Sequence, residues 1–406
     1  MSCASMIVSA SMQRALALAI ACFLACCSAL LAQQDAAVDG VLVDPAVDST
    51  AVLRPHIEVF CGATTASNAM PPWVLMGLLF GGDVTAPLAV TVERTDARGA
   101  AFWGGRAEAG LLLAWQERGD LVRPVALRAG LTSRAWWDAR WSPGAAHFLW
   151  GPLGGADPQN QLRSLEGTQA RGLVTTAFTL EYKTENLKLT GRVGEATMGV
   201  DGQLNQGAFL VDSAHVEVAI EGQLIRTLSP GLMAGLDVEY RNEHVRVGVR
   251  NLGAYSFPMA AHSRMDTSVS TLGWPLITQV FDGAEWAHTD TVVTGVEPGA
   301  VALSGLLPAT LYVHAHAERW SASALWNAWA PRPELMVSRS FISTERLSYS
   351  AGLAWGGWGG LSVPGGLTYT GNQGGKLALK TRIAPWRDVG MRSTIFVSWT
   401  RPFYSY

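Results

Sequence analysis

The residues best suited to hold a metal ion lie together near position 316. His314, His316 and Glu318 alternate along the chain, so on a β-strand their side chains share one face. Two imidazoles and a carboxylate are ligands that zinc or copper accepts. A flat strand, however, spaces such ligands about 7 Å apart along its length, so they converge only with help from a neighbouring strand. We therefore predict a polar wall here and no bound metal.

Serine, histidine and acidic residues could also support hydrolysis, which is the chemistry of a Ser-His-Asp triad. His288 and Asp290 are close in sequence, and His262 precedes Ser263, all in segments that have the composition of loops. The sequence has no Gly-x-Ser-x-Gly turn of the kind that exposes a nucleophilic serine. A triad built from loops is an open alternative, but we predict no catalytic residue and no enzymatic activity.

Neither the glycine-rich stretch nor the cysteines indicate a cofactor. Residues 356–360 are Gly-Gly-Trp-Gly-Gly, without the strand-to-helix context and the following Lys-Ser/Thr of a phosphate-binding loop. Four of the five cysteines lie before residue 28, so Cys61 has no partner for a disulfide in the rest of the chain. We interpret Cys61 as a small apolar residue of a strand, and we predict no cofactor.

The N-terminus has the features of a secretory signal peptide. Arg14 precedes an apolar run over residues 15–31, and polar residues follow. We expect residues 1–32 to be cleaved as a signal peptide, residues 33–54 to form a flexible N-terminal lead, and residues 55–406 to form one domain. An uncleaved membrane anchor is the alternative for the first segment.

Alternation between apolar and polar residues is the main structural signal after the leader. Along residues 236–241 every second residue is apolar and the others are charged, and the next segment repeats the pattern. Such alternation gives a strand one apolar face and one polar face. A turn at Asn242-Glu243 would place Glu239 opposite Arg246, so that charge meets charge across the hairpin. The sequence therefore predicts antiparallel strands.

If these strands cross a membrane, they must close into a barrel. After residue 32 there is no apolar run of about 18 residues, so no spanning helix is expected. An open sheet would leave unpaired backbone groups in lipid. We therefore predict an all-β fold, an antiparallel transmembrane β-barrel of roughly 14 strands (between about 12 and 16), with a short N-terminal helical segment near Pro71. Residues 254–310 alternate weakly and are expected to form long loops or a partly extracellular insertion.

The tryptophans give a second indication of a membrane. The chain has 16 of them, and many lie at or near expected strand ends. Indole rings prefer the boundary between lipid and water, because the ring is apolar and its N–H stays hydrated. The residues expected in such belts are Trp115, Trp137, Trp141, Trp320, Trp329, Trp355, Trp386 and Trp399.

In a barrel the charged face of each strand would line the lumen. Mixed charges there would produce a local field and a weak ion preference. The predicted lumen-lining residues are Glu217, Glu221, Asp237, Glu239, Arg241, Arg246, Arg250, His314, His316, Glu318, Lys376, Lys380 and Arg382.

Short motifs also carry a resemblance to a known family. They are residues 67–71 (SNAMP) leading to 79–83 (LFGGD), 148–151 (FLWG), 229–240 (SPGLMAGLDVEY), 249–253 (VRNLG) and 306–311 (LLPATL). Through them, residues 55–400 resemble uncharacterised porin-like outer-membrane β-barrels, domains of unknown function loosely akin to PorV/PorP and fatty-acid-channel barrels. The chain departs from the pattern after Gly253, where Tyr255 is the only nearby aromatic residue. The resemblance implies a membrane location and a barrel fold, but no substrate and no catalytic residue.

Together these signals predict an outer-membrane β-barrel, either a passive, porin-like channel or a non-enzymatic barrel for surface attachment or export. A secreted soluble all-β binding protein is the alternative, and an outer-membrane barrel hydrolase is the third hypothesis. The expected location is the outer membrane of a Gram-negative-type cell. The expected partners are the lipid bilayer, the barrel-assembly machinery, and secretion or surface-attachment proteins. A formal net charge of −3 argues against nucleic acid as a partner.

Overall fold

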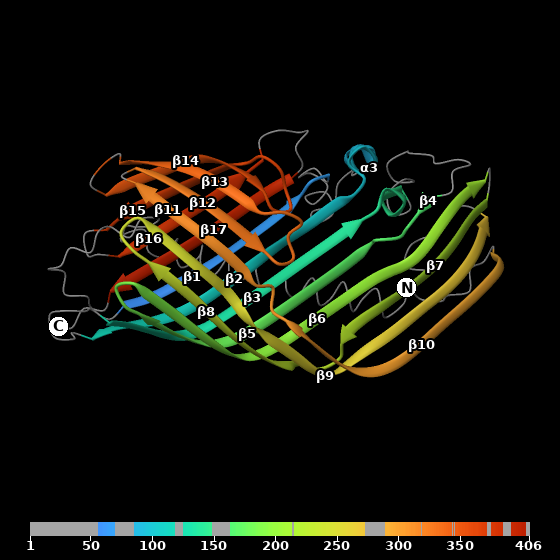
Figure 1. The fold of residues 1–406 in the computed structure, drawn as a ribbon, viewed down its shortest axis with the longest axis horizontal. Helices are drawn as coiled ribbons and strands as arrows, with labels where there is room; N and C mark the ends of the chain where they lie inside the picture. The colour runs from blue at the N-terminus through green and yellow to red at the C-terminus, as the bar shows by residue number, and fades with distance from the viewer. Residues whose placement is uncertain are drawn as a thin grey trace.

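A computed structural model places the chain in a large antiparallel β-barrel (Figure 1). The structure describes residues 56–69, 85–117, 125–147, 163–212, 215–272, 289–317, 319–342, 344, 346–371, 375–384 and 391–402. The expected signal peptide, N-terminal lead and short helical segment near Pro71 lie outside these residues, so they stay predictions. Within the described residues, no helix is both long and apolar enough to cross a membrane.

All the described strands belong to one sheet. They are β1 (His56–Ser67), β2 (Ala101–Glu117), β3 (Val125–Trp141), β4 (Arg163–Ser164), β5 (Gln169–Lys183), β6 (Leu187–Asp212), β7 (His215–Thr227), β8 (Gly231–Arg241), β9 (Val245–Leu272), β10 (Thr289–Leu306), β11 (Thr310–Ala317), β12 (Trp320–Asn327), β13 (Glu334–Ile342), β14 (Leu347–Gly356), β15 (Val363–Thr370), β16 (Lys376–Ile383) and β17 (Met391–Pro402). Helix α3 (Thr85–Arg98) lies between β1 and β2.

The barrel closes because its first and last strands pair. β1 pairs with β2 on one side and with β17 on the other. The β1–β17 ladder is unbroken from His56 opposite Pro402 to Ser67 opposite Met391. A closed ladder leaves no unpaired backbone edge at this seam, which is the condition for crossing lipid with strands. The predicted fold class is confirmed: an antiparallel β-barrel with a wall of 14 strands.

Two of the wall strands are each interrupted near a proline. β7 and β8 lie end to end between β6 and β9, separated by residues 228–230. β10 and β11 likewise follow one another along β9, separated by residues 307–309. Pro230 and Pro308 have no backbone N–H to donate, so a central ladder breaks where they occur. Each pair of short strands therefore counts as one strand of the wall, and the two-residue β4 continues β5 along β6.

The expectation of long loops or an insertion over residues 254–310 is wrong. β9 continues to Leu272, and β10 occupies Thr289–Leu306, so most of the region is strand. The error arises because backbone pairing does not require apolar side chains on alternate residues, and Ser, Thr and Gly hide the pattern. The long strands β6, β7, β9 and β10 extend the barrel on one side, at the right of Figure 1.

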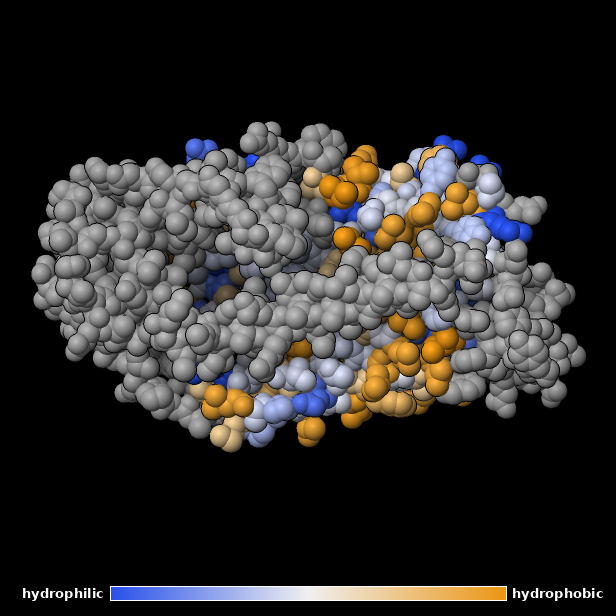
Figure 2. All heavy atoms as spheres, turned by 180° about the vertical axis from the view of Figure 1, so that it is seen from behind, coloured by the Kyte–Doolittle hydropathy of each residue, from blue (hydrophilic) through white to orange (hydrophobic). Residues whose placement is uncertain are grey.

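Apolar side chains alternate along the outer wall. In β8, Leu232, Leu236 and Tyr240 are 77%, 42% and 53% exposed, whereas Met233 on the opposite face is buried. Figure 2 shows hydrophobic residues gathered in patches over the outer surface. Other exposed apolar residues of the wall are Leu131, Phe178, Leu180, Val193, Leu311, Val313, Leu335, Val337, Leu353, Leu367 and Ile395. Such an outer face suits contact with lipid.

An apolar cluster packs inside the barrel, behind the two interrupted strands. Its buried members are Trp136, Leu173, Ala177, Ala196, Met233, Phe257 and Leu307. Trp329 packs against this cluster, instead of standing in an outer aromatic belt as expected. Trp320 and Trp355, in contrast, are 54% and 49% exposed. The tryptophans therefore divide between the interior and the outer surface.

The two ends of the barrel differ. The start of β1, the end of β17 and the tight turns at 184–186 and 242–244 lie at one end, at the left of Figure 1. Helix α3 lies at the other end, where His147 Nε2 and Asp96 Oδ2 are 2.7 Å apart. The sequence does not indicate α3, because its mixture of Thr, Val and charged residues favours neither helix nor strand.

The β8–β9 hairpin has a different register from the predicted one. Glu239 lies opposite Gly248, and not opposite Arg246. The cause is a longer turn, in which the side chain of Asn242 accepts hydrogen bonds from the backbone N–H groups two and three residues ahead, at 2.9 and 2.7 Å. The ladder moves by two residues, so each side chain keeps its face but changes its partner.

Candidate functional site: charged residues inside the barrel

Charged side chains from seven strands meet inside the barrel. We call them the lumenal charge cluster, and its members are Arg106, Glu108, Arg134, Arg192, Asp237, Arg250, Glu334, Lys380 and Arg382. They come from β2, β3, β6, β8, β9, β13 and β16. Ion pairs and longer-range electrostatic interactions connect them. Arg134 pairs with Glu108, and Arg192 with Asp237, on neighbouring strands. Arg134 with Asp237, and Arg382 with Glu334, join strands that are not neighbours, so these contacts run through the interior.

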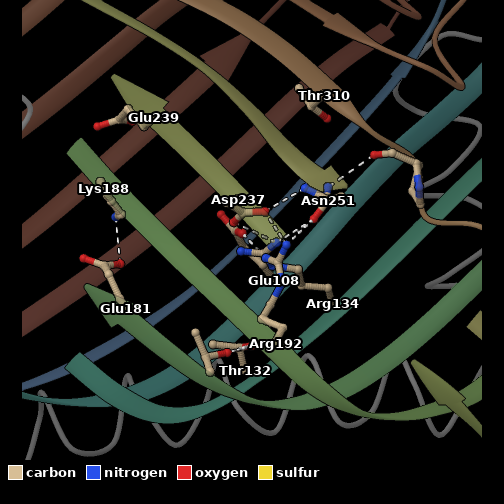
Figure 3. Close-up of polar contacts among 12 residues, drawn as sticks. Glu108, Thr132, Arg134, Glu181, Lys188, Arg192, Asp237, Glu239, Asn251 and Thr310 are labelled. Atoms are coloured by element: carbon tan, nitrogen blue, oxygen red, sulfur yellow. Dashed lines mark hydrogen bonds and ion pairs between the residues drawn. The ribbon is translucent and has the colours of Figure 1, made fainter. Parts of the chain in front are cut away.

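A buried ion pair forms one part of this cluster. The Arg192 guanidinium donates to Asp237 Oδ1, and its Nη2 also donates to Asn251 Oδ1 at 3.0 Å. The exposed fraction is 2% for the Arg192 side chain and 14% for that of Asp237. Figure 3 shows the three side chains pointing toward one another. Removing Asp237 would leave the Arg192 guanidinium buried and uncompensated, so the carboxylate fixes its partner in place.

Asn251 occupies a bulge that supports the pair. Its φ is 61°, and the β8–β9 register shifts between Leu236 and Val238. Its backbone N–H donates to Asp237 Oδ1 at 2.6 Å, and its Nδ2 donates to the Pro308 carbonyl at 3.2 Å. Asparagine adopts left-handed backbone conformations more readily than most residues. The residue type therefore suits both the bulge and the hydrogen bonds.

Arg134 extends the cluster from β3. Its Nη1 donates to Asn251 Oδ1 at 2.7 Å and lies 3.8 Å from Asp237 Oδ2. Its Nε lies 3.7 Å from Glu108 Oε2. β5, β6 and β8 separate β3 from β9 along the wall, so the contact with Asn251 spans the lumen. These side chains therefore narrow the interior at this level.

Two more buried contacts hold the connection after β14 inside the barrel. Arg382 on β16 donates to Glu334 on β13. Asp138 on β3 accepts hydrogen bonds from Trp358 Nε1 at 2.8 Å and from Arg171 Nη2 at 3.1 Å. The first contact crosses β14 and β15, and the second joins β3 to the segment between them. Both tie distant parts of the wall together.

A separate charged set lies nearer the turn at 184–186. Lys188 Nζ lies 2.8 Å from Glu181 Oε2, as Figure 3 shows. Arg128 Nε lies 3.7 Å from Glu181 Oε1, and Arg128 Nη1 donates to Glu58 Oε2 at 3.1 Å. Two cations face two carboxylates, so this set carries no formal net charge.

Three cations of the lumenal charge cluster have no paired carboxylate. Among the described residues, Arg106, Arg250 and Lys380 form no ion pair within 4.0 Å, whereas Arg134, Arg192 and Arg382 all do. Glu108 interacts electrostatically with all three from a longer range. Arg250 also repels both Arg106 and Lys380, so it interacts with each of the other two cations.

Aromatic rings hold two of these cations. The Arg250 guanidinium lies 4.7 Å from the centre of the Tyr312 ring, and Lys380 Nζ lies 5.2 Å from that of Phe396. Tyr312 in turn donates its hydroxyl proton to Glu239. A ring face attracts a cation without neutralising it. Arg250 and Lys380 are therefore positioned by side chains that carry no formal charge.

The structure brings some of the predicted lumen-lining residues together and not others. Asp237, Glu239, Arg250, Lys380 and Arg382 make the contacts described above. Arg241 donates to the carbonyls of Thr184 and Glu185 at the turn end, each at 2.9 Å. His314 lies opposite Arg246 in the β9–β11 ladder, and His316, Glu221 and Lys376 lie on β11, β7 and β16. Glu217 and Glu318 lie outside the side chains that the structure describes. The role of the whole set in lining a conducting pore stays a prediction.

The histidines of β11 stack on each other, with 6.2 Å between the ring centres of His314 and His316. Within the described part of the chain, no group of three His, Cys, Asp or Glu residues could hold a metal ion. Glu318, the third predicted ligand, lies outside that part. Of the residues considered for hydrolysis, His262 and Ser263 lie on β9 and Asp290 lies on β10, so the expectation that they belong to loops is wrong. His288 lies outside the described residues, and the side chains of the other three are not described.

Sequence reasoning missed Arg106, Glu108, Arg134, Arg192 and Glu334. A signal for Arg134 was present, because it lies in a segment whose alternation predicts a strand. Glycines near Arg106 and Arg192 obscure the alternation in β2 and β6. The structure is needed to bring these residues to the same place, since they are far apart in sequence.

No protein-family model and no curated protein matches the sequence. Among solved structures, the Ralstonia pickettii toluene transporter TbuX is 10% identical, with a TM-score of 0.40 over 88% of this chain and 91% of that one. The P. putida toluene transporter TodX is 11% identical, with a TM-score of 0.37 over 88% and 92% of the two chains. OccAB4 of Acinetobacter baumannii is 9% identical, with a TM-score of 0.23 over 88% and 100%.

These scores lie below 0.5, so the barrel assignment rests on the strand pairing of this chain itself. By that pairing the protein is a closed antiparallel barrel. The suggested likeness to PorV/PorP barrels finds no support among the matching structures.

Proposed function

We propose that this protein is a passive channel in an outer membrane. The observation that carries the proposal is a closed barrel with an apolar outer face and a charged inner face. In a soluble β-sandwich or barrel, the apolar faces of the strands are buried in the core and the polar faces are exposed to water. Large apolar side chains such as Leu232 and Leu335 stand on the outside here. In water they would form an exposed apolar surface that promotes aggregation, whereas in a membrane they contact lipid.

The two barrel ends support an orientation for this channel. Outer-membrane barrels have short periplasmic turns and longer extracellular connections. The end with the turns at 184–186 and 242–244 therefore faces the periplasm in our proposal. The end that carries α3 and the long strands β6, β7, β9 and β10 faces outward.

The charged interior supports a path through the lumen for polar and ionic solutes. The side chains of Glu108 and Arg134 keep 29% and 18% of their surface exposed, so water reaches the cluster. No described feature favours hydrolysis over passage. A barrel for surface attachment or export would share this wall, and it differs from a channel only in lacking a permeation path.

Two assays on the full-length protein separate these functions. Cell fractionation should place it in outer membranes as a band whose gel mobility changes on heating. Proteoliposomes that contain it should swell in small sugars or amino acids and should swell less as solute size increases. Release into the soluble periplasm would refute the membrane location. Correct insertion without swelling for any solute or salt would leave the attachment or export function and refute the channel.

A further inference from the structure

The charges of the lumenal charge cluster do not balance. Its carboxylates are Glu108, Asp237 and Glu334, and its cations are Arg106, Arg134, Arg192, Arg250, Lys380 and Arg382. Each carboxylate already has an arginine partner. The other charged set, nearer the turn at 184–186, is balanced. Even when Glu239, which accepts from Tyr312 beside Arg250, is counted with the three carboxylates, the six cations leave an excess of positive charge here.

Arg106, Arg250 and Lys380 supply this excess. They come from β2, β9 and β16, which lie in different parts of the wall. All three interact with Glu108, and Arg250 also repels the other two, so their charges act on the same part of the lumen. A cation that repels its neighbours gains most from an anion placed between them.

The surroundings keep these charges available. Tyr312 and Phe396 hold Arg250 and Lys380 by their ring faces, which accept no proton and carry no formal charge. Besides Glu108, the carboxylates that act on them are Glu334 on Arg106, Asp237 on Arg250 and Glu58 on Lys380. Among the described residues, none of these carboxylates comes within ion-pair distance of the three cations. Rings of Arg and Lys in a pore attract anions and exclude cations of similar size.

We propose that Arg106, Arg250 and Lys380 form an anion-selective site in the lumen, which passes small solutes that carry a carboxylate or phosphate group. The proposal rests on the channel function proposed above and names its substrate class. Guanidinium and ammonium groups bind both oxyanions by charge-assisted hydrogen bonds, so the two share one chemistry. Glu108, held by Arg134, interacts with all three cations and moderates the charge of the site.

Reversal potentials measure this selectivity. The full-length protein is inserted into planar bilayers between a concentrated and a dilute KCl solution, and the zero-current voltage gives the chloride-to-potassium permeability ratio. We expect a ratio above one. Sodium phosphate and sodium benzoate, added to one side, should each reduce the chloride current by occupying the site. Reduction by only one of the two would assign the site to that oxyanion.

Four variants test the residues. Arg106→Gln, Arg250→Gln and Lys380→Gln should each lower the ratio by about fivefold or less, since ~1 kcal/mol is the interaction of unit charges 4 Å apart in water. Lys380→Arg should keep it. The matched control is Arg339→Gln, because the Arg339 guanidinium lies over Trp320 on the exposed outer wall, 5.3 Å from its ring centre. That change should leave the ratio unaltered.

The outcomes separate the two proposals. A protein that inserts but never conducts refutes the channel function. Conductance with a ratio at or below one leaves the channel and refutes the anion site. An anion preference that survives the loss of all three cations refutes the assignment to these residues. The heat-dependent gel mobility of each variant establishes that its barrel has folded.

Discussion

The backbone N–H of Asn251 donates to the same Asp237 oxygen that receives the guanidinium of Arg192. A bulge in β9 and a buried ion pair between β6 and β8 therefore depend on one carboxylate. Because Asp237 accepts both hydrogen bonds, we expect its removal to destabilise the barrel more than the removal of either partner.

Asp237→Ala should destabilise the barrel by about 3–5 kcal/mol, because Arg192 then stays buried without a counter-charge. The measurement is the urea midpoint of the heat-modifiable band in detergent. The double variant Arg192→Met, Asp237→Leu removes both charges and should recover much of the loss. A single variant as stable as the parent would contradict a buried pair at this position.

Asn251 offers a test of the bulge itself. Asn251→Gly keeps the backbone free to adopt a positive φ but loses the side-chain hydrogen bonds, whereas Asn251→Ala loses both. We expect both to be destabilised, with alanine less stable than glycine by about 1 kcal/mol, from the same urea titration. Equal stability of the two variants would mean that the left-handed backbone is not required.

Two glycines provide a matched pair for interior packing. A Cβ on Gly104 would lie 2.2 Å from Trp358 Nε1, which donates to Asp138, while a Cβ on Gly191 would meet no atom within 4 Å. Gly104→Ala should therefore cost about 1–3 kcal/mol, and Gly191→Ala should be neutral or slightly stabilising. Urea midpoints in detergent compare them. A neutral Gly104→Ala would refute the close packing of Trp358 on β2.

The closing seam can be tested with a disulfide. Cys61 on β1 lies opposite Val397 on β17, at a spacing that a disulfide can bridge. Val397→Cys, with the four N-terminal cysteines replaced by serine, should form this bond in the folded barrel and change the gel mobility of the unreduced, unfolded chain.

Ala109→Cys is the control for this cross-link, because Ala109 lies opposite Cys61 on the other side, in the adjoining strand β2. Both variants should form the bond if the barrel is closed. A bond in the Ala109→Cys variant but none in the Val397→Cys variant would indicate an open sheet.

The sequence predicts the architecture better than the site. Alternation along β8 gives its two faces correctly, since a strand's geometry fixes which side chains share a face. The same pattern also predicts a barrel, because strands that cross a membrane must form a closed sheet. These conclusions need only local information.

The local sequence pattern does not predict the register of the β8–β9 hairpin or the extent of β9. Asn242 lengthens the turn through two hydrogen bonds, which move Glu239 away from Arg246. Which arginine meets which carboxylate across the lumen depends on the curvature of the whole wall. Arg134 and Asn251, for example, are 117 residues apart in sequence and 2.7 Å apart at their nearest polar atoms.

Single-channel recording tests the central claim most directly. The purified full-length protein, folded in detergent and added to a planar bilayer in potassium chloride, should produce discrete, reproducible current steps that scale with salt concentration. Heat-unfolded protein from the same preparation should produce none. Stable insertion of the folded barrel without any current step would contradict the proposal that it is a channel.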